Sequence, residues 1–126
     1  MTPTDRMFTK THEWVKIDGT TATIGISDYA QESLGDITFI ELPAAGKKVA
    51  KGSSCCVIES VKAASDIYTP VSGEIAEVNS ALENAPEAIN PTPYDAWLFK
   101  VSGISSADTA DLLDAAAYDA FVESEQ

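Results

Sequence analysis

The sequence is poor in the residues from which catalytic and metal sites are usually built. Its 126 residues include two cysteines and a single histidine. Cys55 and Cys56 are adjacent, so they form no CxxC metal pair, and on a strand their side chains point to opposite faces, which opposes a mutual disulfide. We interpret both as small buried or half-buried apolar residues. An enzyme with His12 and a cysteine as base and nucleophile lacks the third group that would orient the pair.

Positive charge is also scarce. Eight Lys and Arg residues stand against twenty Asp and Glu residues, which gives a net charge of −12. Proteins that track nucleic-acid phosphates present clustered Lys and Arg, so a nucleic-acid partner is excluded. No stretch approaches the roughly 18 apolar residues of a membrane span, and residues 1–10 show neither a signal nor a transit pattern. These features favour a cytoplasmic monomer that docks transiently on its partners.

The residues that are present predict one domain over residues 1–126, because this length suits a single core and 44% of the residues are hydrophobic. Most of the first hundred residues have the pattern of short strands separated by turns. Asp18-Gly19 marks a hairpin turn. The predicted strands are 14–17, 21–26, 36–42, 54–59, 64–69, 74–78 and 97–101, with a turn-rich connection at 47–52 and a loop at 84–93.

Two helices are predicted beside the strands. Residues 28–34 have helical spacing, with Ser27 or Asp28 as the N-cap and Gly35 in the place of a C-cap glycine. A capping box near Ser105 predicts a C-terminal helix over residues 107–122. Its expected apolar stripe is Ala110, Leu113, Ala117 and Phe121. The fold class is therefore mainly β, a sandwich or flattened barrel with two helices.

The residues alone indicate no active site. The chain has no phosphate-binding glycine loop, no HExxH and no GxSxG motif. One segment is unusual: residues 59–66 join two predicted strands without the Gly, Asn or Pro of a tight turn. Its lysine, Lys62, has no property that separates it from the other six lysines, and by default it is a solvated side chain on a strand.

That segment is one of several sequence blocks that follow one another along nearly the whole chain. The blocks are Thr11–Val15, Ala22–Gln31, Leu34–Ile37, Glu41–Pro43, Glu59–Ala63, Pro70–Glu74, Pro93–Tyr94 and Trp97–Lys100. In this order they resemble the H proteins of the glycine cleavage system, a family of lipoyl carriers. The resemblance implies a lipoyl/biotinyl barrel-sandwich hybrid, a flattened β-barrel sandwich in which Lys62 lies at a hairpin tip. It also implies lipoic acid in amide linkage to Lys62.

The resemblance further implies a carrier without catalytic groups or a metal of its own. Lipoylation removes the lysine charge and leaves an arm of about 12 Å from Cα. A pyridoxal-phosphate glycine decarboxylase would load an aminomethyl group onto this arm, and a tetrahydrofolate-dependent aminomethyltransferase would unload it. A dihydrolipoyl dehydrogenase would reoxidise the dithiol, and a lipoyl ligase or transferase would attach the arm. A tethered arm meets each partner at a high effective concentration.

Three side chains match positions that the family associates with a sheltering surface cleft. Glu13 and Asp66 are acids that would pair with an ammonium group, or would otherwise be plain surface acids. Ser33 stands where many members of the family have a larger polar residue such as His. The loop at 94–97 is one residue shorter than the glycine-containing version in the family.

Three alternatives to a glycine cleavage carrier share some of these features. An H-like protein that hands lipoyl groups to other lipoyl domains would use the same Lys62. A biotin carrier has a similar hairpin but places methionines around its lysine, where this chain has Val61 and Ala63. A β-sandwich docking protein without a prosthetic group would tolerate Lys62→Arg.

Overall fold

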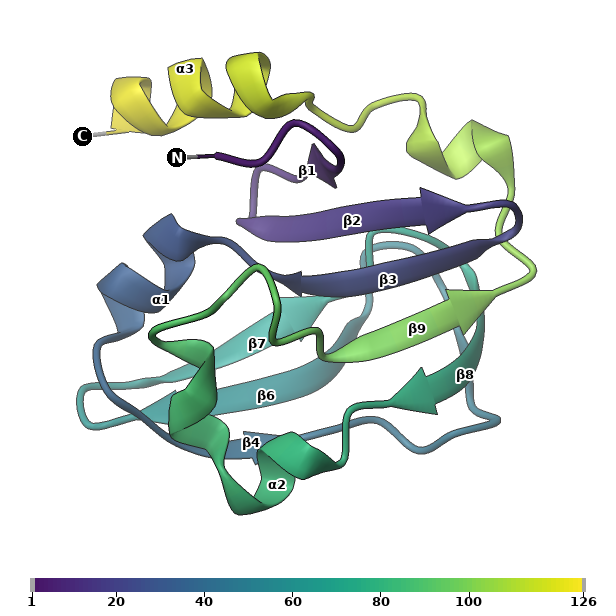
Figure 1. The fold of residues 1–126 in the computed structure, drawn as a ribbon. Coiled ribbons are helices and arrows are strands. Elements are labelled where there is room, and N and C mark those ends of the chain that lie inside the picture. The colour runs from purple at the N-terminus through teal and green to yellow at the C-terminus, as the bar shows by residue number, and fades with distance from the viewer. Residues whose placement is uncertain (1, 126) are drawn as a thin grey trace.

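The computed structural model describes residues 2–125, which fold into two antiparallel sheets with short helices at the periphery (Figure 1). The larger sheet has the strand order β1 (Met7–Phe8), β2 (Glu13–Asp18), β3 (Thr21–Ile26), β9 (Phe99–Ser102), β8 (Gly73–Val78) and β5 (Lys48–Val49). The smaller sheet has the order β4 (Ile37–Glu41), β6 (Ser54–Ser60) and β7 (Ala64–Tyr68). The predicted mainly-β barrel sandwich is confirmed.

The main hydrophobic core lies between the two sheets. Ile24 and Val101 of the larger sheet are completely buried, as is Ile58 of the smaller sheet, and Ile40 and Ile67 are nearly so. Alternate residues of a regular strand point to one face, so most strands contribute every second side chain to this core, and a bulge in β4 separates its core residues Ile37 and Ile40 by three positions. Burial of each such isoleucine favours the folded state by about 1.5–3 kcal/mol.

Strand β2 is buried on both of its faces at its N-terminal end. Val15 joins the main core, whereas its neighbour Trp14 joins a second cluster under the C-terminal helix α3 (Ala115–Glu125). This second cluster consists of Phe8, Trp14, Ala115 and Tyr118. Figure 1 shows α3 lying over β1 and β2 on the side away from the smaller sheet. The helix therefore supplies the cover that the outer face of β2 needs.

The N-terminal half follows the predictions closely. Strands β2 and β3 pair in register around Gly19, whose positive φ of 63° is typical of a hairpin turn. Helix α1 occupies Asp28–Leu34 as predicted, and the Ser27 hydroxyl caps it by accepting the Ala30 N–H. Gly35 ends the helix with a φ of 77°, a region that glycine enters without a steric penalty.

Two connections and the start of one strand differ from the predictions. The turn-rich connection at 47–52 contains the short strand β5, which pairs with β8. The predicted loop at 84–93 contains the 3₁₀ helix η1 (Pro86–Ile89), preceded by α2 (Ala81–Asn84). Leu82 and Ile89 anchor these elements in the main core, so tertiary burial overrides the local loop signals. Strand β9 begins at Phe99, two residues later than predicted.

The predicted C-terminal helix over 107–122 was wrong in its first half. Ser105 does cap a helix, but it is the 3₁₀ helix η2 (Ser106–Thr109). Leu113 then exchanges two backbone hydrogen bonds with Phe8 (2.7 and 2.8 Å), which requires an extended backbone and interrupts the helix. Helix α3 starts beyond this bridge, where Asp114 accepts the Ala117 N–H at 2.8 Å. Within residues 2–125, no helix is long and apolar enough to span a membrane.

Candidate functional site

Lys62 lies at the tip of the hairpin that joins β6 and β7. The Ser60 N–H donates to the Ala63 carbonyl at 2.8 Å and closes the turn. The Ser60 hydroxyl accepts the N–H groups of Lys62 and Ala63, each at 3.2 Å. The serine side chain thus binds backbone N–H groups of a turn that would normally contain glycine or asparagine. This explains how a segment without conventional turn residues reverses direction.

The hairpin tip rests against the end of α1, at the same end of the molecule in Figure 1. The Val61 N–H donates to the Asp36 carbonyl at 3.1 Å. A Cβ atom added to Gly35 would lie 2.8 Å from Cε of Lys62, so the lysine stem passes directly over this glycine. The Asn90 amide binds the Gly35 carbonyl at 2.8 Å and the Ile37 N–H at 3.0 Å. Asn90 therefore fixes the platform on which the lysine lies.

A small cavity of about 170 Å³ lies beside this platform. Its walls are the turn at Thr11 and His12, the inner side of α1, and residues 65–67 of β7. Two of the three predicted cleft residues, Ser33 and Asp66, line it together. The Asp66 carboxylate also accepts the Ser54 hydroxyl at 3.0 Å.

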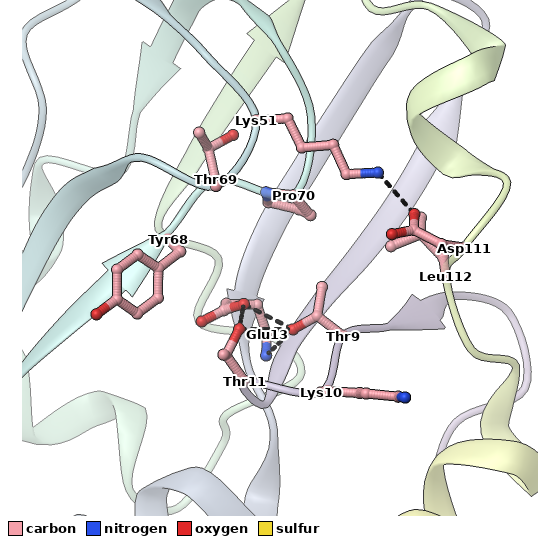
Figure 2. Close-up of a pocket in the computed structure, with 11 residues that line it drawn as sticks. Thr9, Lys10, Thr11, Glu13, Lys51, Tyr68, Thr69, Pro70, Asp111 and Leu112 are labelled. Atoms are coloured by element: carbon pink, nitrogen blue, oxygen red, sulfur yellow. Dashed lines mark hydrogen bonds and ion pairs between the residues drawn. The ribbon is translucent and has the colours of Figure 1, made fainter.

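The third predicted cleft residue, Glu13, lines a larger cavity of about 610 Å³ (Figure 2). Thr11 borders both cavities, so the two hollows adjoin along β7. Figure 2 shows the Glu13 carboxyl group between Tyr68 and Thr9. Glu13 is only 1% exposed, so the alternative of a plain surface acid is wrong for this residue.

Burial raises the pKa of Glu13 above its ordinary value of 4.5, and the hydroxyls of Thr11 and Thr9 oppose the shift. These hydroxyls donate to Oε1 of Glu13 at 2.5 and 2.6 Å. Desolvation favours the neutral acid, whereas hydrogen bonds to the carboxylate favour the charged form. The direction of the shift shows that burial dominates.

We expect Glu13→Gln to change how stability depends on pH. Because the folded-state pKa is raised, the folded chain holds the Glu13 proton to a higher pH than the unfolded chain. The stabilisation is complete below about pH 4.5 and is lost as the pH rises through the folded-state pKa. Urea unfolding between pH 4.5 and 8 should therefore show the wild type losing stability relative to Glu13→Gln as pH rises. The matched control is Glu83→Gln, which changes an exposed residue of α2. If the free energies of unfolding of wild type and Glu13→Gln differed by the same amount at every pH, the expectation would be contradicted.

Lys62 is distinguished from the other lysines by its position, because its lack of an ion pair in the described chain is shared with three of them. Ion pairs within residues 2–125 involve Lys16, Lys51 and Lys100 but not Lys62. Lys10, Lys47 and Lys48 are likewise outside these pairs. Across the described part of the chain, no group of His, Cys, Asp and Glu side chains could hold a metal ion.

The cysteines and the histidine are not arranged for nucleophilic catalysis. Cys56 is buried and Cys55 half-buried, and both thiols are free, as interpreted from the sequence. Burial raises the pKa of Cys55 to about 12, so its thiolate is rare at neutral pH. Both ring nitrogens of His12 are already engaged, Nδ1 by the Tyr118 hydroxyl and Nε2 by the Glu125 carboxylate.

Several residues of the site have no signal of their own in the sequence. Thr11, Ser65 and Asn90 are ordinary polar residues whose positions depend on contacts between distant segments. Ser60 is the exception, because a serine at the end of a strand is a known turn former.

A β-barrel sandwich that presents a lysine at the tip of a hairpin is the architecture of a carrier domain, and comparison with known proteins agrees. The family model described as "Glycine cleavage H-protein" matches residues 6–125. The chain belongs to this family, the lipoyl carriers of glycine cleavage.

Individual relatives give the same result. The chain is 52% identical over 124 residues to a glycine cleavage system H protein of Thermus thermophilus, covering 98% of this chain and 97% of the relative. A glycine cleavage system H protein of Acidobacterium capsulatum is 51% identical over 123 residues, covering 98% and 95%. The crystal structure of the glycine cleavage system H protein from Mycobacterium marinum superimposes with a TM-score of 0.86 at 38% identity, covering 96% and 98%.

Proposed function

We propose that the chain is the shuttle of the glycine cleavage system in the cytoplasm, with lipoic acid in amide linkage to Lys62. It would carry an aminomethyl group from the pyridoxal-phosphate glycine decarboxylase to the tetrahydrofolate-dependent aminomethyltransferase. Dihydrolipoyl dehydrogenase would then reoxidise it, and a lipoyl ligase or transferase would modify it first. The observation that carries the proposal is Lys62 itself, exposed at the tip of a hairpin built around it.

The residues around Lys62 fit an acylated lysine. The amine has no carboxylate partner among the described ion pairs, so amidation breaks no salt bridge of the described chain. Val61 beside it is 68% exposed, which leaves the tip open to a modifying enzyme. When bound, the lipoyl group supplies the dithiolane that accepts the one-carbon cargo.

The small cavity is at a suitable distance to receive the arm. A fully extended chain rises about 3.3 Å per residue, so Asp66, four residues beyond Lys62, lies at most about 13 Å from it. An amide-linked arm with a reach of about 12 Å would cover a distance of this order. Asp66 would attract an ammonium group there, and Ser33 on α1 would offer a hydroxyl from the facing wall.

Glu13 would act from the neighbouring cavity, behind Thr11. Its carboxyl group is held by Thr9 and Thr11 and is shielded from water. A cation in the adjoining cavity would favour the ionised form of this buried acid. The chain itself would supply binding and exclusion of water, and its partners the chemistry.

The proposal is tested by the intact mass of the full chain after incubation with lipoate, ATP and a lipoyl ligase, followed by fragment mapping. We expect a single lipoyl increment located on Lys62. A known lipoyl domain in a parallel reaction shows that the ligase is active. An unmodified Lys62 under those conditions would overturn the proposal.

A further inference from the structure

Helix α3 is connected by hydrogen bonds to two of the three walls of the small cavity. Tyr118, which is only 2% exposed, points from α3 toward the start of α1 and the turn before β2. Its hydroxyl lies 2.6 Å from Oγ of Ser27 and 2.8 Å from Nδ1 of His12. One phenol group thus joins segments that are about 90 and 106 residues away in sequence.

Both hydrogen-bond partners of Tyr118 help to form those two walls. Ser27 is the N-cap of α1, and its hydroxyl accepts the Ala30 N–H at 3.2 Å. The Ser27 N–H in turn donates to the His12 carbonyl at 3.0 Å. His12 and Ala30 themselves line the cavity. A shift of the Tyr118 hydroxyl would therefore move two walls relative to β7.

A second contact from α3 completes the hold on His12. The Glu125 carboxylate lies 3.0 Å from Nε2 of His12. With a neutral imidazole, Nε2–H donates to Glu125 and Nδ1 accepts the Tyr118 hydroxyl, which accepts the Ser27 hydroxyl, so every group is satisfied. His12 has a φ of 72°, a conformation that non-glycine residues adopt only when their surroundings enforce it.

We propose that α3 is a clamp on the arm cleft, with Tyr118 and Glu125 as positioning residues that hold His12 and the start of α1 in place. The inference rests on the proposed function, because the small cavity shelters an arm only if Lys62 carries one. None of the described residues of α3 lines this cavity. The proposal nevertheless predicts that α3 controls how tightly the cavity closes.

The first test needs no lipoyl group. Amide hydrogen exchange is measured on the full unmodified chain as wild type and as Tyr118→Phe. Loss of the hydroxyl should speed exchange at the Ala30 and Gln31 amides about fivefold, which corresponds to loss of the one hydrogen bond that holds the Ser27 cap. The Gly46 and Ile75 amides, which bond between the 44–47 turn and β8, should not change.

The second test measures the lifetime of the cargo on the lipoylated protein. After loading by glycine and glycine decarboxylase, water cleaves the sulfur-bound aminomethyl group to formaldehyde and ammonia and leaves the free thiol. Ammonia release should be about fivefold faster in Tyr118→Phe. It should also be faster in Glu125→Ala, which removes the acceptor for Nε2–H of His12 at an exposed residue and should not affect folding. Lipoylation of Lys62 should be unchanged in both variants.

Two controls separate positioning from general loosening. Glu77→Ala makes the same change at an ion pair with Lys100, which does not border the small cavity. Val101→Ala weakens the main core at a site outside the cavity. Equal acceleration in Val101→Ala, or unchanged release and exchange in both α3 variants, would overturn the clamp while leaving the carrier function intact. If the wild type cannot be lipoylated, the proposed function fails and the exchange test alone decides whether α3 holds these walls.

Discussion

Lys62→Arg is expected to abolish lipoylation completely. The guanidinium group keeps the positive charge and nearly the length of the side chain, but its pKa above about 12 leaves no free nitrogen nucleophile to acylate. The variant should therefore show no lipoyl mass increment under conditions that modify the wild type fully. It should also support no glycine-dependent methylene transfer when the partner enzymes are present.

Lys48→Arg provides the matched control. Lys48, on strand β5, is an exposed lysine like Lys62, and it too belongs to none of the described ion pairs. We expect this variant to be lipoylated and to transfer methylene groups like the wild type. Both substitutions are at exposed sites and should shift the free energy of unfolding by less than about 0.5 kcal/mol. If Lys62→Arg still transferred methylene groups, the carrier function would be wrong, and a docking protein without a prosthetic group would be favoured.

Gly25→Ala is expected to destabilise the fold strongly, although it adds only one methyl group. A Cβ atom at Gly25 would lie 2.4 Å from Cε2 of Trp14, a contact that real Cβ atoms do not make. Trp14 cannot move away easily, because it is buried and its Nε1–H donates to the Pro93 carbonyl at 3.0 Å. We expect a loss of about 2–3 kcal/mol in the free energy of unfolding, measured by urea denaturation.

A double-mutant cycle tests whether the indole ring is the cause. Trp14→Leu removes the indole atoms that a residue-25 methyl group would meet. The loss caused by Gly25→Ala should therefore be smaller in the Trp14→Leu background than in the wild type. Equal losses in the two backgrounds would show that strain elsewhere in β3 is responsible.

The short-range features of the fold were predictable because local residues determine them. The hairpin at Gly19 and helix α1 with its Ser27 cap depend on neighbours in the sequence. The hairpin at Lys62 was different. Strand propensity alone allows one continuous strand there, and only the family resemblance predicts a hairpin. Its physical cause is the Ser60 hydroxyl, which accepts the N–H groups of the turn.

The errors arose where distant segments pair. The sequence contains a helical pattern through Leu113, but the bridge between Phe8 and Leu113 joins residues 105 positions apart and makes the backbone extended there. In the same way, Ile89 becomes part of the core only when the loop that carries it packs against the sheets. No local pattern reports such contacts.

The candidate site was also predictable only in part. Asp66 and Ser33 were matched by resemblance and do lie in one cavity, although neither has a distinguishing pattern of its own. Glu13 was matched as well, but its near-complete burial depends on the turn at Thr9–Thr11 and on Tyr68, which come together only in three dimensions. The contribution of Tyr118 and Glu125 had no signal in the sequence.

The double burial of β2 sets a limit on how small such a protein can be made. Of two adjacent residues in this strand, Val15 packs in the barrel interior and Trp14 packs in the layer under α3. A shortened version that ends before α3 would therefore expose Trp14 and Phe8 to water and create an aggregation-prone apolar surface beside the barrel. The last turns of the chain are consequently part of the minimal unit for anyone designing a compact scaffold on this architecture, even though they lie far from the hairpin that bears Lys62.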